Sequence, residues 1–478
     1  MKRCILYSLS GLVTLSAYSQ HTSNGNVPPN ILLIVVDDMG FSDIQPFGGE
    51  IQTPHINRLA EQGIRFTRFH TSSLSAPTRA MLLTGVDNHQ NGLGIMPPLH
   101  AENQYMQPGY EGGINHSVMT LAEVLHENNY YTCMAGKWHL GAQKENIPSE
   151  RGFDQSFTML GGGAGHFCNS FALSESEQPV TFYLDNGKRV DKLPDDFYST
   201  RYYTDKMIEY LRKCPQNKPF FSYLAFTAPH DPLQIIPEWK NRNKGIYDGG
   251  YDSIRVARLE RQRQMGLIPA QTPDTGLSNP NKQWNFLNEE QKKEQSRKME
   301  IYASMIEYVD YSIGRVIKEL EEEHKLNNTL ILFMSDNGAN PKEPESYPGN
   351  TKETIQEKYD NQLGNYGNSN SFISLGEAWA EVCNTPYSLY KMTTHEGGIC
   401  VPLIISGKNM PQKGSIDHST LLHVTDLFPT ILEYTHTQRP SSYHNIPLAP
   451  LYGKSFVQKL TDTESLPSRT SGEALVLK

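Results

Sequence analysis

Two pairs of oxygen-bearing side chains follow long apolar runs of the sequence. Asp37 and Asp38 come after "NILLIVV", and Asp336 and Asn337 come after "TLILFMS". Neighbouring residues of a strand point to opposite faces, but beyond its end both side chains can turn toward one ion. Three carboxylates and an amide oxygen are hard ligands that suit calcium or magnesium better than zinc. Either pair alone is better explained as a turn or helix cap; the recurrence at two strand ends favours a metal site.

Cationic and imidazole side chains follow other apolar runs. Lys137 and His139 flank Trp138, His230 follows "TAP", and Lys391 precedes "MTTHEGG". Around a hard metal, such groups could bind an oxyanion and move protons. Each alone has an ordinary alternative, a structural histidine or a solvated lysine. His395 is at least as well explained by a turn, and we leave it out of the site.

The stretch "SLSAPTRAMLLTG" has the features of a helix start. Pro77 suits the first turn, where its missing N–H is not needed, and Ser75 could cap the same helix. An unmodified serine is also a weak nucleophile. The stretch alone therefore does not decide whether Ser75 or Arg79 takes part in chemistry.

The elements that must position these residues alternate along the chain. Apolar runs predict buried strands, and segments such as "TPHINRLAEQ" and "VMTLAEVLHEN" predict helices between them. One further helix is predicted from an apolar stripe at helical spacing, formed by Ile306, Val309, Ile313, Val316 and Leu320. This order predicts an α/β fold with a mostly parallel sheet covered by helices on both faces. Ligands bind such sheets at the carboxyl ends of the strands, where the polar residues above lie.

The chain has 478 residues and a formal net charge of -9. That length can bury a large core, and the acidic balance argues against nucleic acid as a partner. Residues 240–297 are charged and predict a peripheral insertion, and residues 340–375 predict a long surface loop. After residue 19 no run is apolar and long enough to span a membrane.

The N-terminus has the pattern of a secretory signal peptide over residues 1–19, with Lys2 and Arg3 before an apolar stretch. We therefore expect export to the periplasm or the medium. Cys4 would leave with the signal. The other cysteines show no C-x-x-C spacing and predict no zinc site.

Taken together, the motifs resemble those of one enzyme family. "SAPTR" followed by "LLTG" is similar to the sulfatase signature, and the ordered set "VVDDMG", "GKWHLG", "APHDPL", "SDNG" and "YKMTTHEGG" resembles type I sulfatases of the alkaline phosphatase superfamily, arylsulfatase-like branch. The resemblance extends from about Asn30 to Ser455. It implies a sulfatase-like catalytic α/β domain over residues 20–455. Residues 456–478 would begin a smaller C-terminal subdomain that is largely absent.

The resemblance also implies roles for individual residues. Ser75 aligns with the residue that the family oxidises to formylglycine (3-oxoalanine), which requires a maturing enzyme able to oxidise serine and points to bacteria. Arg79 would hold the modified side chain. Calcium would be bound by Asp37, Asp38, residue 75, Asp336 and Asn337. Sulfate binding and proton transfer would fall to Lys137, His139, His230 and Lys391. His139 would act as a base, and His230 or Lys391 would protonate the leaving oxygen.

The expected activity is hydrolysis of a sulfate ester to an alcohol and inorganic sulfate. Carbohydrate, steroid and aryl sulfates would share the same site residues, so the sequence does not separate these substrates. Two alternatives remain open: a phosphodiesterase or phosphonate monoester hydrolase on the same scaffold, and an inactive truncated relative.

Overall fold

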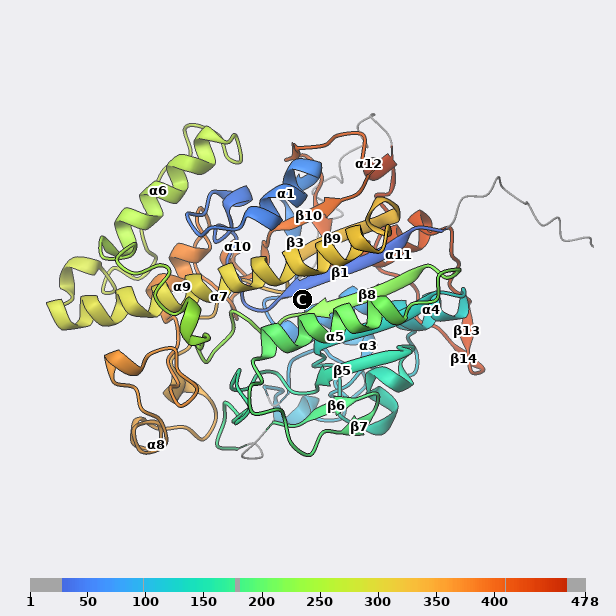
Figure 1. Cartoon of the computed structure of the whole chain (residues 1–478), viewed down its shortest axis with the longest axis horizontal. Coiled ribbons are helices and arrows are strands. Elements are labelled where there is room, and N and C mark those ends of the chain that lie inside the picture. The colour runs from blue at the N-terminus through green and yellow to red at the C-terminus, as the bar shows by residue number, and fades with distance from the viewer. Residues whose placement is uncertain (1–27, 98, 177–180, 409, 462–478) are drawn as a thin grey trace, which may run out of the picture.

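A ten-stranded sheet crosses the part of the molecule that the structure, a computed structural model, describes (residues 28–97, 99–176, 181–408 and 410–461; Figure 1). The strands lie in the order β11-β2-β10-β9-β1-β8-β4-β5-β6-β7. Their bounds are β1 (Asn30–Val36), β2 (Gly63–Phe66), β4 (Tyr131–Lys137), β5 (Gln155–Met159), β6 (Tyr183–Asp185), β7 (Lys188–Arg189), β8 (Phe220–Ala225), β9 (Thr329–Ser335), β10 (Leu403–Ser406) and β11 (Ser415–Asp417).

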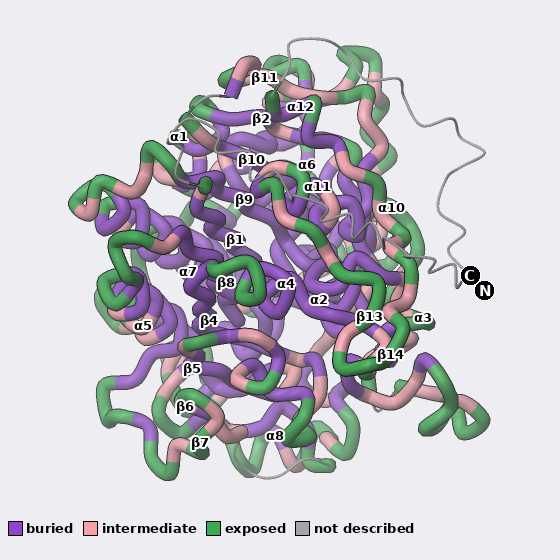
Figure 2. Tube along the Cα trace, turned by 90° about the vertical axis from the view of Figure 1, so that its right-hand side faces the viewer, coloured by how far each residue is buried: buried purple, intermediate pink, exposed green. Residues whose placement is uncertain are grey.

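The middle of the sheet is parallel. Strands β9, β1, β8, β4 and β5 run in one direction, and β10 and β6 pair antiparallel at its flanks. Strand β1 is apolar at successive positions because its side chains enter two cores, Leu32 and Ile34 on one face and Leu33 and Val35 on the other. Figure 2 shows the central strands in purple, the colour of buried residues. The predicted α/β fold is confirmed.

Helices cover both faces of the sheet. On one side lie α1 (Pro54–Gln62), α5 (Ser199–Lys213) and α7 (Glu289–Glu322) (Figure 1). On the other lie α2 (Ser75–Thr84), α4 (Leu121–Glu127) and α11 (Leu427–Tyr434). The predicted stripe on α7 is buried against the first core at Ile306, Val309, Ile313, Val316 and Leu320.

Helix α7 is longer than its apolar stripe suggests. It begins at Glu289, inside the segment predicted as an insertion, because Asn288 and Gln291 form a capping box there. The same segment contains α6 (Gly250–Gln264). The region 340–375 contains α8 (Lys352–Lys358), and its final residues pack inward, with Phe372 and Ile373 buried.

The remaining strands and α-helices are short. They are β3 (Phe69–His70) paired with β12 (Leu422–His423), the β13 (Ser442–Tyr443) and β14 (Ile446–Pro447) hairpin, and the helices α3 (Asn88–Asn91), α9 (Glu377–Cys383), α10 (Glu396–Ile399) and α12 (Gln458–Thr461). The expected signal peptide and residues 462–478 lie outside the described residues. Within the described ranges, every helix is too short or too polar to cross a membrane.

Candidate functional site

The two oxygen-bearing pairs meet because β1 and β9 are neighbours. Their parallel register aligns Val36 with Ser335, so the residues that follow each strand leave the sheet side by side. Ligand oxygens of Asp37, Asp38 and Asp336 all lie within 4.8 Å of one another, and all three side chains are buried.

Asp38 turns toward the others through a left-handed backbone conformation, φ 62°. Its backbone N–H donates to Asp336 Oδ1 at 3.2 Å. Its Oδ1 accepts from Asn337 Nδ2 at 2.6 Å. A cluster of buried carboxylate and amide oxygens fits a hard cation such as calcium.

Ser75 is the first residue of α2 and faces this cluster. Its Oγ lies 3.0 Å from Asp37 Oδ1 and 3.1 Å from Asn337 Oδ1, and its one hydroxyl proton can be donated to either oxygen. The hydroxyl is therefore directed at the acidic cluster and makes no side-chain cap of its own helix. The helix N-terminus adds partial positive charge at the same point.

Arg79 lies one turn further along α2 and is fully buried. Its Nε and Nη2 donate to Asp336 Oδ2 at 3.0 and 2.7 Å. Burial opposes the positive charge, but Asp336, Tyr223 and Asp37 outweigh it and raise the pKa of Arg79. Tyr223 of β8 accepts a further hydrogen bond from Arg79 at 3.3 Å; sequence reasoning missed this tyrosine, which lies inside an apolar run.

Two lysines complete the charge balance. Lys137 Nζ, at the end of β4, lies 2.7 Å from Asp37 Oδ2, and Lys391 Nζ lies 2.7 Å from Asp38 Oδ1. Three cations therefore face three carboxylates. Burial acts to raise the pKa values of Asp37 and Asp38, but the cations, led by Lys137 and Lys391 respectively, and His230 outweigh it and lower both.

His139 is held beside the cluster by its neighbours. Trp138 is buried in the core, and His139 itself has a left-handed backbone, φ 60°. Gly162 leaves room for the imidazole, since a Cβ at this position would lie 2.9 Å from His139 Cε1. The Nδ1 atom is buried without a hydrogen-bond partner. Burial and the charge of Lys137 lower the pKa of His139 well below its usual value, so the ring is neutral at pH 7.

His230 presents one nitrogen to the site. Its Nδ1 lies 2.9 Å from the carbonyl oxygen of Asp231 and, as the donor there, leaves Nε2 facing Asp38 Oδ2 at 3.3 Å. Burial lowers the pKa of His230, while Asp38 opposes the shift. His166 supports this loop: its Nε2 donates to the carbonyl oxygen of His230 at 3.1 Å, and its Nδ1 accepts from Ser199 Oγ at 2.7 Å. No local motif marks His166 as part of this support.

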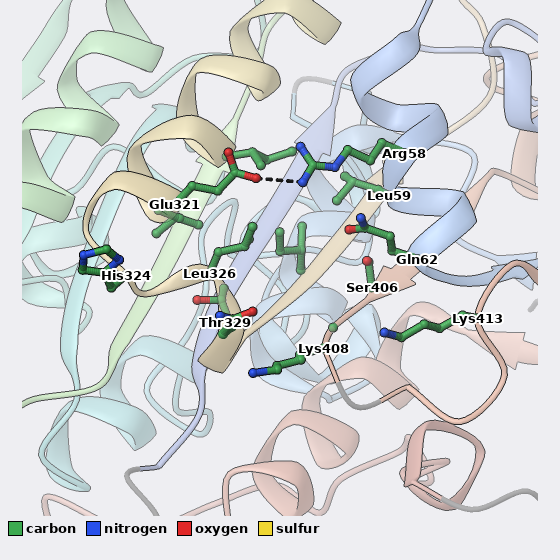
Figure 3. Close-up of a pocket in the computed structure, with 15 residues that line it drawn as sticks. Arg58, Leu59, Gln62, Glu321, His324, Leu326, Thr329, Ser406, Lys408 and Lys413 are labelled. Carbon is green, nitrogen blue, oxygen red and sulfur yellow. Dashed lines mark hydrogen bonds and ion pairs between the residues drawn. The ribbon is translucent and has the colours of Figure 1, made fainter.

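The structure thus brings the predicted site residues to one edge of the sheet. His395, which was left out, is exposed at the start of α10. A pocket of about 380 Å³ lies elsewhere, between Leu59, Thr329 at the start of β9 and Ser406 at the end of β10 (Figure 3). That is the opposite edge of the sheet, and this pocket contains none of the predicted site residues.

Comparisons with known proteins point to one family. A family model described as Sulfatase matches residues 29–437. An arylsulfatase of Klebsiella aerogenes is 41% identical over 428 residues, covering 89% of this chain and 91% of the relative. An uncharacterized sulfatase of Schizosaccharomyces pombe is 43% identical over 424 residues, covering 86% of this chain and 76% of that protein.

Solved structures show the same fold. Ps i-CgsB in complex with k-i-k-neocarrahexaose has a TM-score of 0.61 and 26% identity, covering 91% of this chain and 77% of that one. The phosphonate monoester hydrolase of Agrobacterium radiobacter has a TM-score of 0.55 at 18% identity, covering 92% of this chain and 79% of that one. The second likeness is one of fold alone.

Proposed function

The chain belongs to the sulfatase family and is a sulfuric ester hydrolase; from this premise we propose that it uses a formylglycine made from Ser75 together with a bound calcium ion. The observation that carries the proposal is the position of Ser75, whose hydroxyl lies between Asp37 and Asn337. The modified residue would be held at the acidic cluster, beside the cations that bind sulfate.

Each charged residue then has a task. Calcium would be held by Asp37, Asp38, Asp336, Asn337 and residue 75, and it would supply positive charge next to the sulfuryl oxygens. The aldehyde would supply, as its hydrate, a stronger nucleophile than a serine hydroxyl. Arg79 holds Asp336 in place at the bottom of the site through two hydrogen bonds. Lys137 and Lys391 can attract the sulfate oxygens because each ammonium is already held at the cluster.

The two imidazoles divide the proton transfers. His139 is neutral, has a free buried nitrogen and accepts a proton from residue 75 when sulfate is released. His230 presents Nε2 and, once protonated, donates to the leaving oxygen, with Asp38 stabilising the imidazolium. Lys391 is the alternative donor at this step.

An intact-mass measurement combined with a substrate panel tests the proposal. The protein is produced with a sulfatase-maturing enzyme able to oxidise serine, and the peptide containing residue 75 should lose two hydrogens. Calcium-loaded protein should then release phenol from an aryl sulfate much faster than from a phosphate diester or a phosphonate monoester. Ser75→Ala is the control and should show neither the mass change nor activity. A protein that is fully active without modification of residue 75 would refute the proposal that formylglycine is used.

Export is a separate proposal. We propose that residues 1–19 are removed as a signal peptide and that a bacterial host delivers the remaining chain to the periplasm or the medium. N-terminal sequencing of the exported protein tests this, with Gln20 as the expected first residue.

A further inference from the structure

A second cluster of potential metal ligands lies outside the catalytic site. It consists of His70 at the end of β3, Glu396 at the start of α10, and Cys400, which follows that helix. One ligand atom from each residue can be chosen so that all three lie within 4.8 Å of one another. None of the three has a task in the proposed sulfatase chemistry.

The backbone brings the three residues together from two distant segments. His70 and Cys400 face each other across an antiparallel bridge. The N–H of Cys400 donates to the carbonyl oxygen of Glu396 at 2.8 Å, so these two residues follow each other across a single turn. The nearby N–H of Thr71 donates to the carbonyl oxygen of Ile399 at 2.8 Å and fixes the segments against each other.

Without a metal, the side chains pair with each other and with the backbone, and the Cys400 thiol donates to the carbonyl oxygen of Thr67 at 3.5 Å. His70 Nε2 lies 3.0 and 3.3 Å from the two carboxylate oxygens of Glu396. His70 and Cys400 are buried, whereas the Glu396 side chain is 51% exposed, which leaves a route for an ion from solvent. An ion pair with Glu396 does not satisfy the imidazole, since Nδ1 of His70 is buried without a hydrogen-bond partner.

We propose that His70, Glu396 and Cys400 form a zinc site, chemically distinct from the oxygen-lined catalytic cluster. Thiolate, imidazole and carboxylate are the three ligand types that zinc takes in proteins, whereas calcium takes oxygen ligands. Donor atoms around a tetrahedral zinc lie about 3.3–3.8 Å apart, from bonds of about 2.0–2.3 Å. The ligand atoms of the cluster lie within 4.8 Å of one another and would draw together to reach this spacing, and water entering beside Glu396 can supply the fourth ligand.

Zinc would replace protons at this site. Binding removes the proton from the Cys400 thiol and requires a neutral His70, so protons are released as the metal binds and affinity falls in acid. The bound ion would tie β3 to the segment that contains Lys391. Because β3 leads into Ser75 within five residues, the metal would rigidify one wall of the catalytic site without contacting substrate.

Sequence spacing gives no sign of this site. His70 and Glu396 are 326 positions apart, and Cys400 belongs to no C-x-x-C motif. The expectation that the cysteines form no zinc site came from spacing alone, and spacing cannot detect ligands that the fold assembles from two distant segments.

Cobalt provides a direct test, because a thiolate bound to Co²⁺ gives a charge-transfer band in the near ultraviolet. Full-length, calcium-loaded protein is titrated with Co²⁺ and then with Zn²⁺. We expect a band that saturates at one equivalent per chain, is displaced by zinc and is lost in Cys400→Ser. His70→Gln and Glu396→Gln should weaken cobalt binding on the order of tenfold or more.

Two controls make the result specific. Cys214→Ser changes another buried cysteine, and Asp37→Asn changes the catalytic cluster; both should retain the band. Absence of a saturable thiolate band, or its persistence in Cys400→Ser, would overturn the zinc site. Glu396→Gln, at a half-exposed position, tests the same site if the cysteine variant does not fold. The readout does not depend on sulfatase activity, so the two proposals fail independently.

Discussion

Replacing Lys137 by methionine should make the protein bind calcium more tightly while its sulfatase activity falls. Lys137 Nζ lies 2.7 Å from Asp37 Oδ2, and the two side chains are 1% and 0% exposed. In the calcium-free protein this ammonium supplies the charge that a metal would supply. On the proposed mechanism, lysine and calcium would therefore compete for the same carboxylate, although both would be needed for turnover.

The size of the effect follows from the burial of the pair. Removing one partner of a buried ion pair costs 3–5 kcal/mol because the other charge is left uncompensated. Arg79 remains 3.5 Å from Asp37 Oδ1, so the lower end, about 3 kcal/mol, is expected for the calcium-free protein. If calcium recovers this loss in full, its affinity rises about 100-fold, since about 1.4 kcal/mol corresponds to tenfold.

Urea unfolding with chelator and with calcium measures the two stabilities, and competition with a chromophoric chelator measures calcium affinity. Lys206→Met is the matched control, because Lys206 pairs with the partly exposed Asp185 at 3.0 Å. That variant should lose no more than about 1 kcal/mol, equally with and without calcium. Calcium affinity in Lys137→Met equal to or below that of the wild type would refute the competition between lysine and metal.

Four further outcomes are expected. Ser75→Ala should lose turnover by on the order of 10⁴-fold or more yet remain folded, with unfolding free energy lowered by no more than about 1–3 kcal/mol for the lost hydrogen bond, as measured by aryl sulfate assay and urea titration. His139→Ala should release about one equivalent of alcohol in quenched-flow assays and then stall. His230→Ala should instead slow that first release, most of all for alkyl leaving groups. If His139→Ala shows no burst, His139 is not the base that releases sulfate. Chelation should abolish activity and calcium should restore it, with circular dichroism unchanged, because the three carboxylates keep their cations without metal. Burial lowers the pKa of His166 to about 4, so the unfolded chain binds more protons than the folded one below pH 6.5. Unfolding free energy should fall by up to about 3 kcal/mol between pH 6.5 and 4, and His166→Gln should flatten that slope.

Much of the fold could be predicted because its signals are local. An apolar run such as that of β1 is readable without partners, since both faces of a parallel strand are buried. The stripe from Ile306 to Leu320 is also readable without partners, since it has the helical spacing of a face that is buried in the core. The stripe does not show where α7 begins, because the first turns of the helix are polar and depend on the capping box of Asn288 and Gln291.

The placement of the candidate site could be inferred only in outline. Ligands bind such sheets at the carboxyl ends of the strands, so Asp37 and Asp336 were expected to lie near each other, but the sequence gives no strand order and did not predict that β1 and β9 are neighbours. Which cation pairs with which acid depends on the side-chain directions of Arg79 on α2, Lys137 at the end of β4 and Lys391 in the loop before α10, and no sequence pattern encodes that. Tyr223 and His166 act through contacts more than 60 residues away, at 3.3 and 3.1 Å, and neither lies in a recognisable motif.

The charge balance explains why the ordered motifs carry more information than any one of them. Asp37, Asp38 and Asp336 are buried, and each is paired with a cation from a motif at least 100 positions away, Lys137, Lys391 and Arg79 respectively. An unpaired buried charge costs about 3–5 kcal/mol, a large share of a total stability of about 5–15 kcal/mol. Loss of the cation in one motif therefore leaves a buried carboxylate in another motif unpaired, so the three carboxylates and their three cations must be retained or replaced together. That coupling is physical and independent of substrate, so on the proposed mechanism these residues would specify the chemistry of the site and leave the choice of sulfate ester to the surrounding loops.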